Sequence, residues 1–268
     1  MRAVQMRVTV LALTDHDTIA GIDAAQRAIA QHKLALKLIP GVEISTLWNH
    51  HEIHILGLGI NVDSSVLSTL LSSQVCHRMR RAEAISMRLE KAHIPGALKR
   101  ATELAGGGSI TRGHFARFLV EQGEALNQAQ VFKKYLVKGK PGYVPPQWCT
   151  IEEAIDTIHH SGGQAVLAHP GSYQLSAKWL KRLINHFAQE GGDAIEVAQC
   201  QQSLQERRQL AVYADENGLA VSQGSDFHRP CAWIELGRNL WLPGGADAVW
   251  MRYPQLQPSK DVEYQEKQ

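Results

Sequence analysis

The chain has 268 residues, of which 44% are hydrophobic and 20% are charged, a composition typical of a globular protein and not of a disordered one. Its 28 lysines and arginines nearly balance its 26 aspartates and glutamates, and the net charge of +2 excludes a protein whose whole surface is a basic trap for nucleic acid. The sequence contains no apolar run of about 18 residues that would predict a membrane span, and no signal peptide is evident, so we expect a cytoplasmic protein.

The N-terminal part of the chain predicts three strands and one helix. Residues 8–13 form a continuous apolar run, typical of a buried parallel strand, and the apolar face of residues 19–32 predicts a helix after it. A second strand region covers residues 36–39 and 42–44, and the alternation in residues 52–58 predicts a third strand.

Region 62–149 changes character and predicts an inserted helical subdomain. Helical patterns cover residues 76–93, 111–122 and 127–136, separated by turns that contain glycine. A stiff, proline-rich linker over residues 140–146 ends the insertion. Seven basic residues gather in its first half: Arg78, Arg80, Arg81, Arg88, Lys91, Lys99 and Arg100.

Strand and helix patterns alternate again from residue 150. Thr150 with Glu153, and Ser203 with Glu206, are capping boxes that predict the starts of two helices, and a third helix is expected over residues 176–190. The expected strands are residues 164–168, 194–197 and 219–222. This order implies parallel strands with covering helices, hence an α/β barrel or a wound sheet.

These patterns predict the domain organisation. Residues 1–61 and 150–243 together would form one discontinuous α/β domain, and residues 62–149 the helical insertion. Residues 244–268 are polar and predict a loosely attached tail.

Six side chains that can bind a metal lie in the predicted strands or directly after them. The C-terminal ends of parallel strands share one edge, where active sites are built, so we expect these side chains to converge. Nitrogen and oxygen donors suit zinc, manganese or iron, and six exceed the need of one ion, so we expect two or more metals, with Glu43 able to bridge two of them. The six donors are His16, Glu43, His54, His169, Asp226 and His228.

Each of these residues also has a plain structural explanation. His16 could belong to a helix cap, His169 could be a hydrogen-bonded core histidine, and His54 could face solvent. Asp226 and His228 could form only a salt-bridged pair. Their joint placement favours the metal site, because unrelated core histidines would not all follow strands. No nucleophile elbow, Walker loop or Rossmann glycine motif offers a different chemistry.

Five short motifs agree in order and spacing with one known family. They are Leu-Thr-Asp-His-Asp at 13–17, Gly-Val-Glu at 41–43, His-Ile-Leu-Gly at 54–57, Ala-His-Pro at 168–170 and Ser-Asp-Phe-His at 225–228. On these motifs the chain, up to about residue 243, resembles the polymerase-and-histidinol-phosphatase (PHP) phosphoesterases. Thr-Arg-Gly-His-Phe at 111–115 and Gly-Tyr-Val-Pro-Pro at 142–146 look like its ribonuclease AM branch, which is also described as a 3′,5′-nucleoside bisphosphate phosphatase and a 5′-to-3′ exoribonuclease.

The resemblance implies a distorted (β/α)7-type barrel with a trinuclear metal site and the helical insertion as a cap. The six donors would be ligands of divalent metals, manganese first and iron or zinc as alternatives, with Glu43 bridging. Metal-activated hydroxide would attack phosphorus in nucleoside bisphosphates or at the 5′ ends of short RNA, without a catalytic residue beyond the ligands. Arg112, His114 and Lys140 would contact the substrate's second phosphate, although an arginine at a helix start is also typical of a solvated surface.

One feature of the family has no counterpart in the sequence. Members begin with a strand that carries His-x-His, followed by an aspartate, and these supply three more ligands. The expected barrel therefore lacks its first strand, through either a misassigned start codon or a truncated gene, of which we favour the former because the other ligands are present. For the chain as written we expect weakened or missing catalysis, and uncovered strand edges that lower solubility.

Two other functions remain open from the sequence. One is a phosphatase of the histidinol-phosphate type. The basic insertion argues against it, because it favours a nucleotide or short RNA as the substrate. The other is a non-catalytic remnant that binds metal or nucleotide, because the N-terminal ligands are absent. We expect neither a membrane association nor an obligate protein partner.

Overall fold

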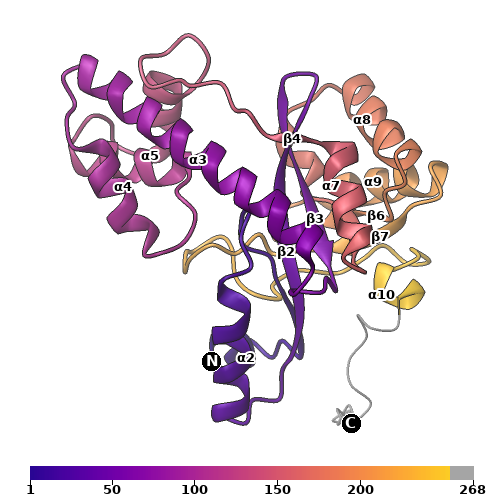
Figure 1. Cartoon of the computed structure of the whole chain (residues 1–268). Coiled ribbons are helices and arrows are strands. Elements are labelled where there is room, and N and C mark those ends of the chain that lie inside the picture. The colour runs from indigo at the N-terminus through magenta and orange to yellow at the C-terminus, as the bar shows by residue number, and fades with distance from the viewer. Residues whose placement is uncertain (254–268) are drawn as a thin grey trace. The chain divides into compact units, whose positions relative to one another are not determined.

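The computed structural model describes residues 1–253. The chain divides into two compact units, one formed by residues 1–68 with residues 150 onward and the other by residues 69–149 (Figure 1). No helix among the described residues combines the length and the apolar character that crossing a membrane requires.

The first unit is built on a curled, mixed sheet with the strand order β1-β2-β3-β5-β6-β7. Its strands are β1 (Val10–Leu13), β2 (Lys37–Trp48), β3 (His51–Leu58), β5 (Gln164–Leu167), β6 (Ala194–Ala198) and β7 (Ala220–Gln223). The pairs β1/β2, β5/β6 and β6/β7 are parallel, whereas β3 runs antiparallel to both β2 and β5. The prediction of an α/β fold is confirmed, and the expected parallel pairing is found among β5, β6 and β7, whereas the sheet as a whole is mixed because β3 is antiparallel to its neighbours.

A tight hairpin explains the direction of β3. Trp48 pairs with His51, so only Asn49 and His50 make the turn, and both have positive φ angles, 45° and 67°. Two-residue turns of this kind match the twist of an antiparallel ribbon. The predicted break at Pro40 and Gly41 is absent, and β2 instead changes partners there, pairing with β1 before Gly41 and with β3 from Gly41 onward.

Helices cover the sheet between its strands. They are α1 (Arg2–Gln5), α2 (Gly21–Gln31), α7 (Ile151–His160), α8 (Ala177–Gln189), α9 (Leu204–Glu216) and α10 (Val249–Arg252), with a 3-10 turn, η2 (Pro170–Tyr173), and a two-residue strand, β4 (Cys149–Thr150). Both predicted capping boxes are confirmed. The Thr150 hydroxyl oxygen accepts from Glu153 N at 3.2 Å while Glu153 Oε2 accepts from Thr150 N at 2.8 Å, and Ser203 and Glu206 repeat this exchange.

The core beneath the sheet includes residues from the expected C-terminal tail. Val249 is 1% exposed and packs with Val166, Ala194 and Ala220, so α10 belongs to the fold rather than to a loose tail. The Tyr253 hydroxyl donates to Asp193 Oδ1 at 2.7 Å. The rest of the expected tail, residues 254–268, lies outside the described part of the chain.

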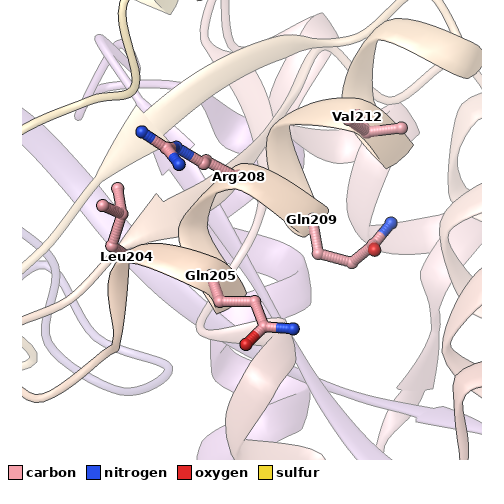
Figure 2. A pocket seen from close by; sticks show the side chains of 5 residues that line it. All are labelled: Leu204, Gln205, Arg208, Gln209 and Val212. Atoms are coloured by element: carbon pink, nitrogen blue, oxygen red, sulfur yellow. The ribbon is translucent and has the colours of Figure 1, made fainter.

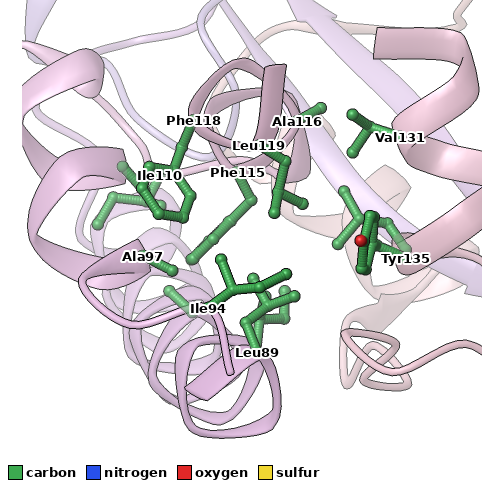
Figure 3. Packing of buried hydrophobic residues seen from close by; sticks show 14 residues of the cluster. Leu89, Ile94, Ala97, Ile110, Phe115, Ala116, Phe118, Leu119, Val131 and Tyr135 are labelled. Atoms are coloured by element: carbon green, nitrogen blue, oxygen red, sulfur yellow. The ribbon is translucent and has the colours of Figure 1, made fainter. Parts of the chain in front are cut away.

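The second unit is helical. It contains most of α3 (Ser65–Lys91), then α4 (Ala97–Ala105), α5 (Arg112–Glu121), α6 (Gln128–Val131) and a π-helical turn, η1 (Phe132–Leu136). Its core packs Leu89, Phe115, Leu119 and Leu136 at 1% exposure or less (Figure 3). Helix α4 had not been expected, because its short apolar pattern lies between Pro95-Gly96 and a run of three glycines.

Several of the basic residues in this unit hold its own fold together. The guanidinium groups of Arg78 and Arg81 lie 4.8 and 5.3 Å from the Trp148 ring centroid, and both side chains are buried. Arg88 Nε donates to the Pro141 carbonyl at 2.9 Å, and Arg100 pairs with Glu121. The seven basic residues expected in this region are therefore not one free cationic surface.

Candidate metal centre

The site forms where strands of the first unit end. His16 follows β1, His169 follows β5, and Asp226 and His228 follow β7. Glu43 and His54 instead lie within the long β2–β3 ribbon. A strand edge thus supplies four of the six predicted donors, and the ribbon that borders it supplies two.

Backbone pairing sets His16 and His54 against Glu43. Beyond the end of β1 the chain still pairs with β2, since Glu43 N donates to the Asp15 carbonyl at 3.0 Å and Asp17 N donates to the Glu43 carbonyl at 2.9 Å. In the ribbon, Ser45 lies opposite His54, so Glu43 and His54 project from the same face two positions apart.

Three imidazoles surround the Glu43 carboxylate. His54 Nδ1 and His169 Nε2 lie 2.9 and 3.0 Å from its Oε1 atom, and His16 Nδ1 lies 3.6 Å from its Oε2 atom. Glu43 itself is only 5% exposed. Two of the imidazoles also contact each other, with His54 Nδ1 and His169 Nε2 3.1 Å apart.

This donor set fits a divalent metal. One ligand atom from each of His16, Glu43 and His54 can be chosen so that all three lie within 4.8 Å of one another, close to the span of two metal–ligand bonds of about 2.0–2.2 Å. Imidazole nitrogen with carboxylate oxygen suits zinc, manganese and iron. The Nδ1 atom of His169 is buried and makes no hydrogen bond within the described residues, so nothing there competes for that nitrogen.

Asp226 and His228 complete the rim of the cluster. The His228 ring lies 5.6 Å from the His16 ring, and His228 Nδ1 lies 3.4 Å from Asp226 Oδ1. Their side chains are more exposed than those around Glu43, at 60% for His228 and 40% for Asp226. The structure therefore brings all six predicted donors to one region, four in a tight group and two at its open side.

The electrostatics of the group favour an ionised carboxylate. Burial alone would raise the pKa of Glu43, but His16, His169 and His54 outweigh burial and hold that pKa well below its usual range. For His169 burial would lower the pKa, yet the Glu43 carboxylate raises it to about 9. The two shifts have one cause, because the Glu43 carboxylate and the His169 imidazole each favour the charged form of the other.

Strained backbone marks two of the donors. His169 has a φ of 29° and Asp226 a φ of 50°, in the left-handed region that residues other than glycine seldom adopt. Each such conformation costs on the order of 1–3 kcal/mol and persists where surrounding contacts enforce it. Strain of this kind is concentrated at functional sites.

Tyr173 is one residue that the sequence analysis missed. Its hydroxyl donates to the Ala168 carbonyl at 2.9 Å and accepts from His54 N at 2.9 Å, and its ring lies edge-on to His169 at 5.2 Å. Burial raises the pKa of this phenol well above its usual range. Tyr173 therefore joins two donor-bearing segments, a role that no local pattern announces.

Glu196 is the second residue that was missed. It is buried on β6, and its Oε2 atom accepts from His169 N at 2.7 Å. Burial raises its pKa to about 7. A carboxylate inside the apolar run of β6 was a signal in the sequence that could have identified it, because buried acids in strands require a partner.

The predicted phosphate contacts all belong to the helical unit. His114 Nδ1 accepts from Thr111 N at 3.0 Å and so caps α5. The Arg112 guanidinium lies 5.8 Å from the Phe132 ring centroid, and Lys140 is exposed in the turn after η1. Each residue thus has a local structural role or an exposed position.

A shallow pocket elsewhere in the first unit has a different character. It runs along the outer face of α9 (Figure 2). None of its lining residues is one of the six donors, so it is separate from the candidate metal centre. The residues are Leu204, Gln205, Arg208, Gln209 and Val212.

Comparison with curated proteins finds close relatives, whereas no model of a known protein family matches the chain. The chain is 63% identical over 262 residues to the 5′-3′ exoribonuclease Rnm of Escherichia coli, covering 98% of this chain and 89% of that protein. It is 41% identical over 251 residues to a 3′,5′-nucleoside bisphosphate phosphatase of Chromobacterium violaceum, covering 93% and 87%.

Solved structures share the fold. An amidohydrolase from Chromobacterium violaceum, with bound sulfate and no metal, matches with a TM-score of 0.88 and 38% identity over 97% of this chain and 91% of that one. A protein from Bifidobacterium adolescentis assigned as a metal-dependent phosphoesterase matches with a TM-score of 0.78 and 26% identity, covering 93% and 86%.

Proposed function

The chain belongs to the PHP-like phosphoesterases, in the group of the 5′-3′ exoribonuclease Rnm and the 3′,5′-nucleoside bisphosphate phosphatase, and from this membership we propose that it hydrolyses phosphate esters of nucleotides. Its substrates are 3′,5′-nucleoside bisphosphates and the 5′ ends of short RNA. The observation that carries the proposal is the buried Glu43 carboxylate with three imidazole nitrogens 2.9–3.6 Å from its oxygens.

Six residues are the proposed ligands of divalent metal ions. Manganese is our first choice, and iron and zinc are alternatives that the same nitrogen and oxygen donors suit. Metal ions held there would polarise phosphoryl oxygens and lower the pKa of a bound water towards neutrality. We propose Glu43 as the bridging ligand, because its two oxygens face different imidazoles. The ligands are His16, Glu43, His54, His169, Asp226 and His228.

The surrounding residues hold these ligands in place. Tyr173 fixes the backbone of His54 relative to Ala168, and Glu196 fixes the backbone of His169. Because ligand geometry must be set before a substrate arrives, such contacts contribute to catalysis without touching the phosphate.

We propose Arg112, His114 and Lys140 as contacts for the second phosphate of the substrate. Guanidinium and ammonium groups are the usual partners of phosphate oxygens, and Arg112 offers five N–H donors. His114 Nδ1 caps α5, and substitution of His114 tests its proposed phosphate contact.

The fold we propose for the first unit is part of a distorted (β/α)7-type barrel.

A substrate panel tests the proposed activity. Release of inorganic phosphate is measured from adenosine 3′,5′-bisphosphate and from histidinol phosphate with added manganese, and mononucleotide release from a 5′-phosphorylated oligoribonucleotide. We expect the two nucleotide substrates to react and histidinol phosphate to react poorly. Reaction of histidinol phosphate alone would identify the protein as a phosphatase of the histidinol-phosphate type. Thermal stabilisation by nucleotides without turnover would identify it as a non-catalytic remnant.

A further inference from the structure

Two tryptophans meet at the tip of the β2–β3 ribbon. Trp48 is the last residue of β2 and Trp179 lies in the first turn of α8, and their rings are edge-to-face with centroids 5.6 Å apart. His51, across the hairpin turn, has its ring 6.3 Å from Trp179. Figure 1 shows the tip of the ribbon beside α8. With Arg182, these residues form what we call the Trp179 platform.

The platform is rigid underneath and open above. Trp48 is 8% exposed and also stacks on His186 at 6.1 Å, and His186 Nε2 is held by Glu152 Oε1 at 3.0 Å. Trp179, in contrast, leaves 36% of its surface exposed. A large aromatic ring is therefore presented to solvent on a support whose own rings are fixed.

An uncompensated positive charge lies on this ring. The Arg182 guanidinium is 4.6 Å from the Trp179 centroid, and no carboxylate of residues 1–253 lies within ion-pair distance of it. Lys181, the next residue back on α8, differs in that its ammonium pairs with Glu216 at 3.4 Å. On this helix Lys181 is thus neutralised, whereas the neighbouring Arg182 is available to a ligand.

An exposed aromatic ring beside a free guanidinium matches single-stranded nucleic acid. Bases stack on aromatic rings regardless of sequence, and a guanidinium attracts the phosphates between them. Rigid support lowers the entropic cost of binding, because the ring is already held in place.

We propose that the Trp179 platform binds the RNA chain downstream of the 5′ end that the metal centre hydrolyses. This inference rests on the proposed function. The ribbon connects the two places, since Trp48 is five residues beyond Glu43 and His51 three residues before His54, or about 16 and 10 Å along a strand. Side chains alternate between the two faces of a strand, and Trp48 lies an odd number of residues from Glu43, so its side chain projects from the opposite face of the ribbon. The RNA would therefore pass over the hairpin tip to reach the platform.

This path makes the platform selective for substrate length. A nucleoside bisphosphate bound with one phosphate at the metal centre would not extend over the tip, whereas an oligoribonucleotide would. The platform therefore contributes to the affinity for RNA and not to the affinity for mononucleotides.

Substitutions on α8 test the proposal. Trp179→Ala is expected to raise the KM for a 5′-phosphorylated ten-nucleotide RNA by about 5- to 150-fold, the range found for single base-stacking residues. Hydrolysis of adenosine 3′,5′-bisphosphate stays within about twofold, and Trp179→Phe recovers much of the RNA affinity. An equal loss on both substrates would overturn the proposal and indicate a structural role, and so would an unchanged KM for RNA.

Charge-matched variants give a second readout. Arg182→Gln should weaken RNA binding and make the slope of log binding constant against log salt concentration shallower, by the amount expected for the loss of about one phosphate contact. Lys181→Gln removes a paired lysine of the same helix and should change neither quantity. Binding of fluorescein-labelled RNA in the presence of a chelator measures this without turnover. Failure of hydrolysis on every substrate would refute the proposed function, while equal RNA binding by the parent protein and Arg182→Gln would refute the platform.

Discussion

His54 Nδ1 lies 2.9 Å from Glu43 Oε1, across two strands that are paired antiparallel. The contact depends on register, because a shift of β3 by one residue would turn His54 to the opposite face of the ribbon. The two-residue turn at Asn49 and His50 sets that register. The hairpin thus places a carboxylate and an imidazole within reach of one cation.

Glu43→Gln tests the charge at the centre of the cluster. The substitution keeps the size of the side chain but removes the negative charge that faces three imidazoles, and we expect kcat/KM to fall at least about 100-fold, with fewer metal ions per chain. Elemental analysis and phosphate release measure the two effects. Glu216→Gln, at an exposed pair on the same unit, serves as the control, and a Glu43→Gln protein with parental metal content would disprove the assignment.

Tyr173→Phe tests the link between the donor-bearing segments. The change leaves His54 N and the Ala168 carbonyl without their partner, so we expect the free energy of unfolding to fall by about 1–3 kcal/mol. Denaturant unfolding measures it. Tyr143→Phe, in the other unit, is the control, and equal losses from both substitutions would mean that the Tyr173 bridge is unimportant.

Gly224→Ala tests the packing around Glu196. An added Cβ would lie 2.0 Å from Glu196 Oε1, so the carboxylate that holds His169 must move. We expect a loss of about 1–3 kcal/mol in stability together with reduced metal affinity. Gly244→Ala is a matched control, because an added Cβ there meets no atom within 4 Å. A neutral effect of Gly224→Ala would show that Glu196 does not need its observed position.

Tyr253→Phe tests the docking of the C-terminal segment through its pH dependence. Burial and the hydrogen bond to Asp193 raise the pKa of Tyr253 to about 12, above its unfolded value near 10. The neutral phenol stabilises the fold, so its contribution is complete below pH 10 and is lost as pH rises towards 12. The Tm, measured between pH 9 and 12, should fall less steeply with pH for Tyr253→Phe than for the parent protein. Parallel curves of Tm against pH for the two proteins would contradict the contribution of this phenol.

Local features were the most predictable from the sequence. The capping boxes that begin at Thr150 and Ser203 depend on residues only three positions apart in sequence. The predicted ends of β6 and β7 lie within one residue of the observed ends. The direction of β3 could not be read in the same way, because strand pairing depends on partners far along the chain. A parallel arrangement was inferred from the order of elements, whereas the two-residue turn at Asn49 and His50 can join only antiparallel strands.

The candidate site shows the same division. Four of its six proposed donors follow strands, whose ends share an edge of the sheet, so they could be located from the order of elements. Glu43 and His54 instead lie within strands, and their approach depends on the register of the ribbon. Tyr173 acts through a hydroxyl that meets His54 N, 119 residues away in sequence, and nothing near Tyr173 indicates that contact. Glu196 was the intermediate case, since a glutamate in a wholly apolar strand calls for a buried partner.

The most direct measurement is phosphate release from adenosine 3′,5′-bisphosphate before and after the metal is removed. Protein treated with a chelator should release no phosphate, and added manganese should restore the rate in the parent protein but not in Glu43→Gln. An unchanged rate after complete removal of metal, or full restoration in Glu43→Gln, would contradict a metal-dependent phosphoesterase centred on that carboxylate.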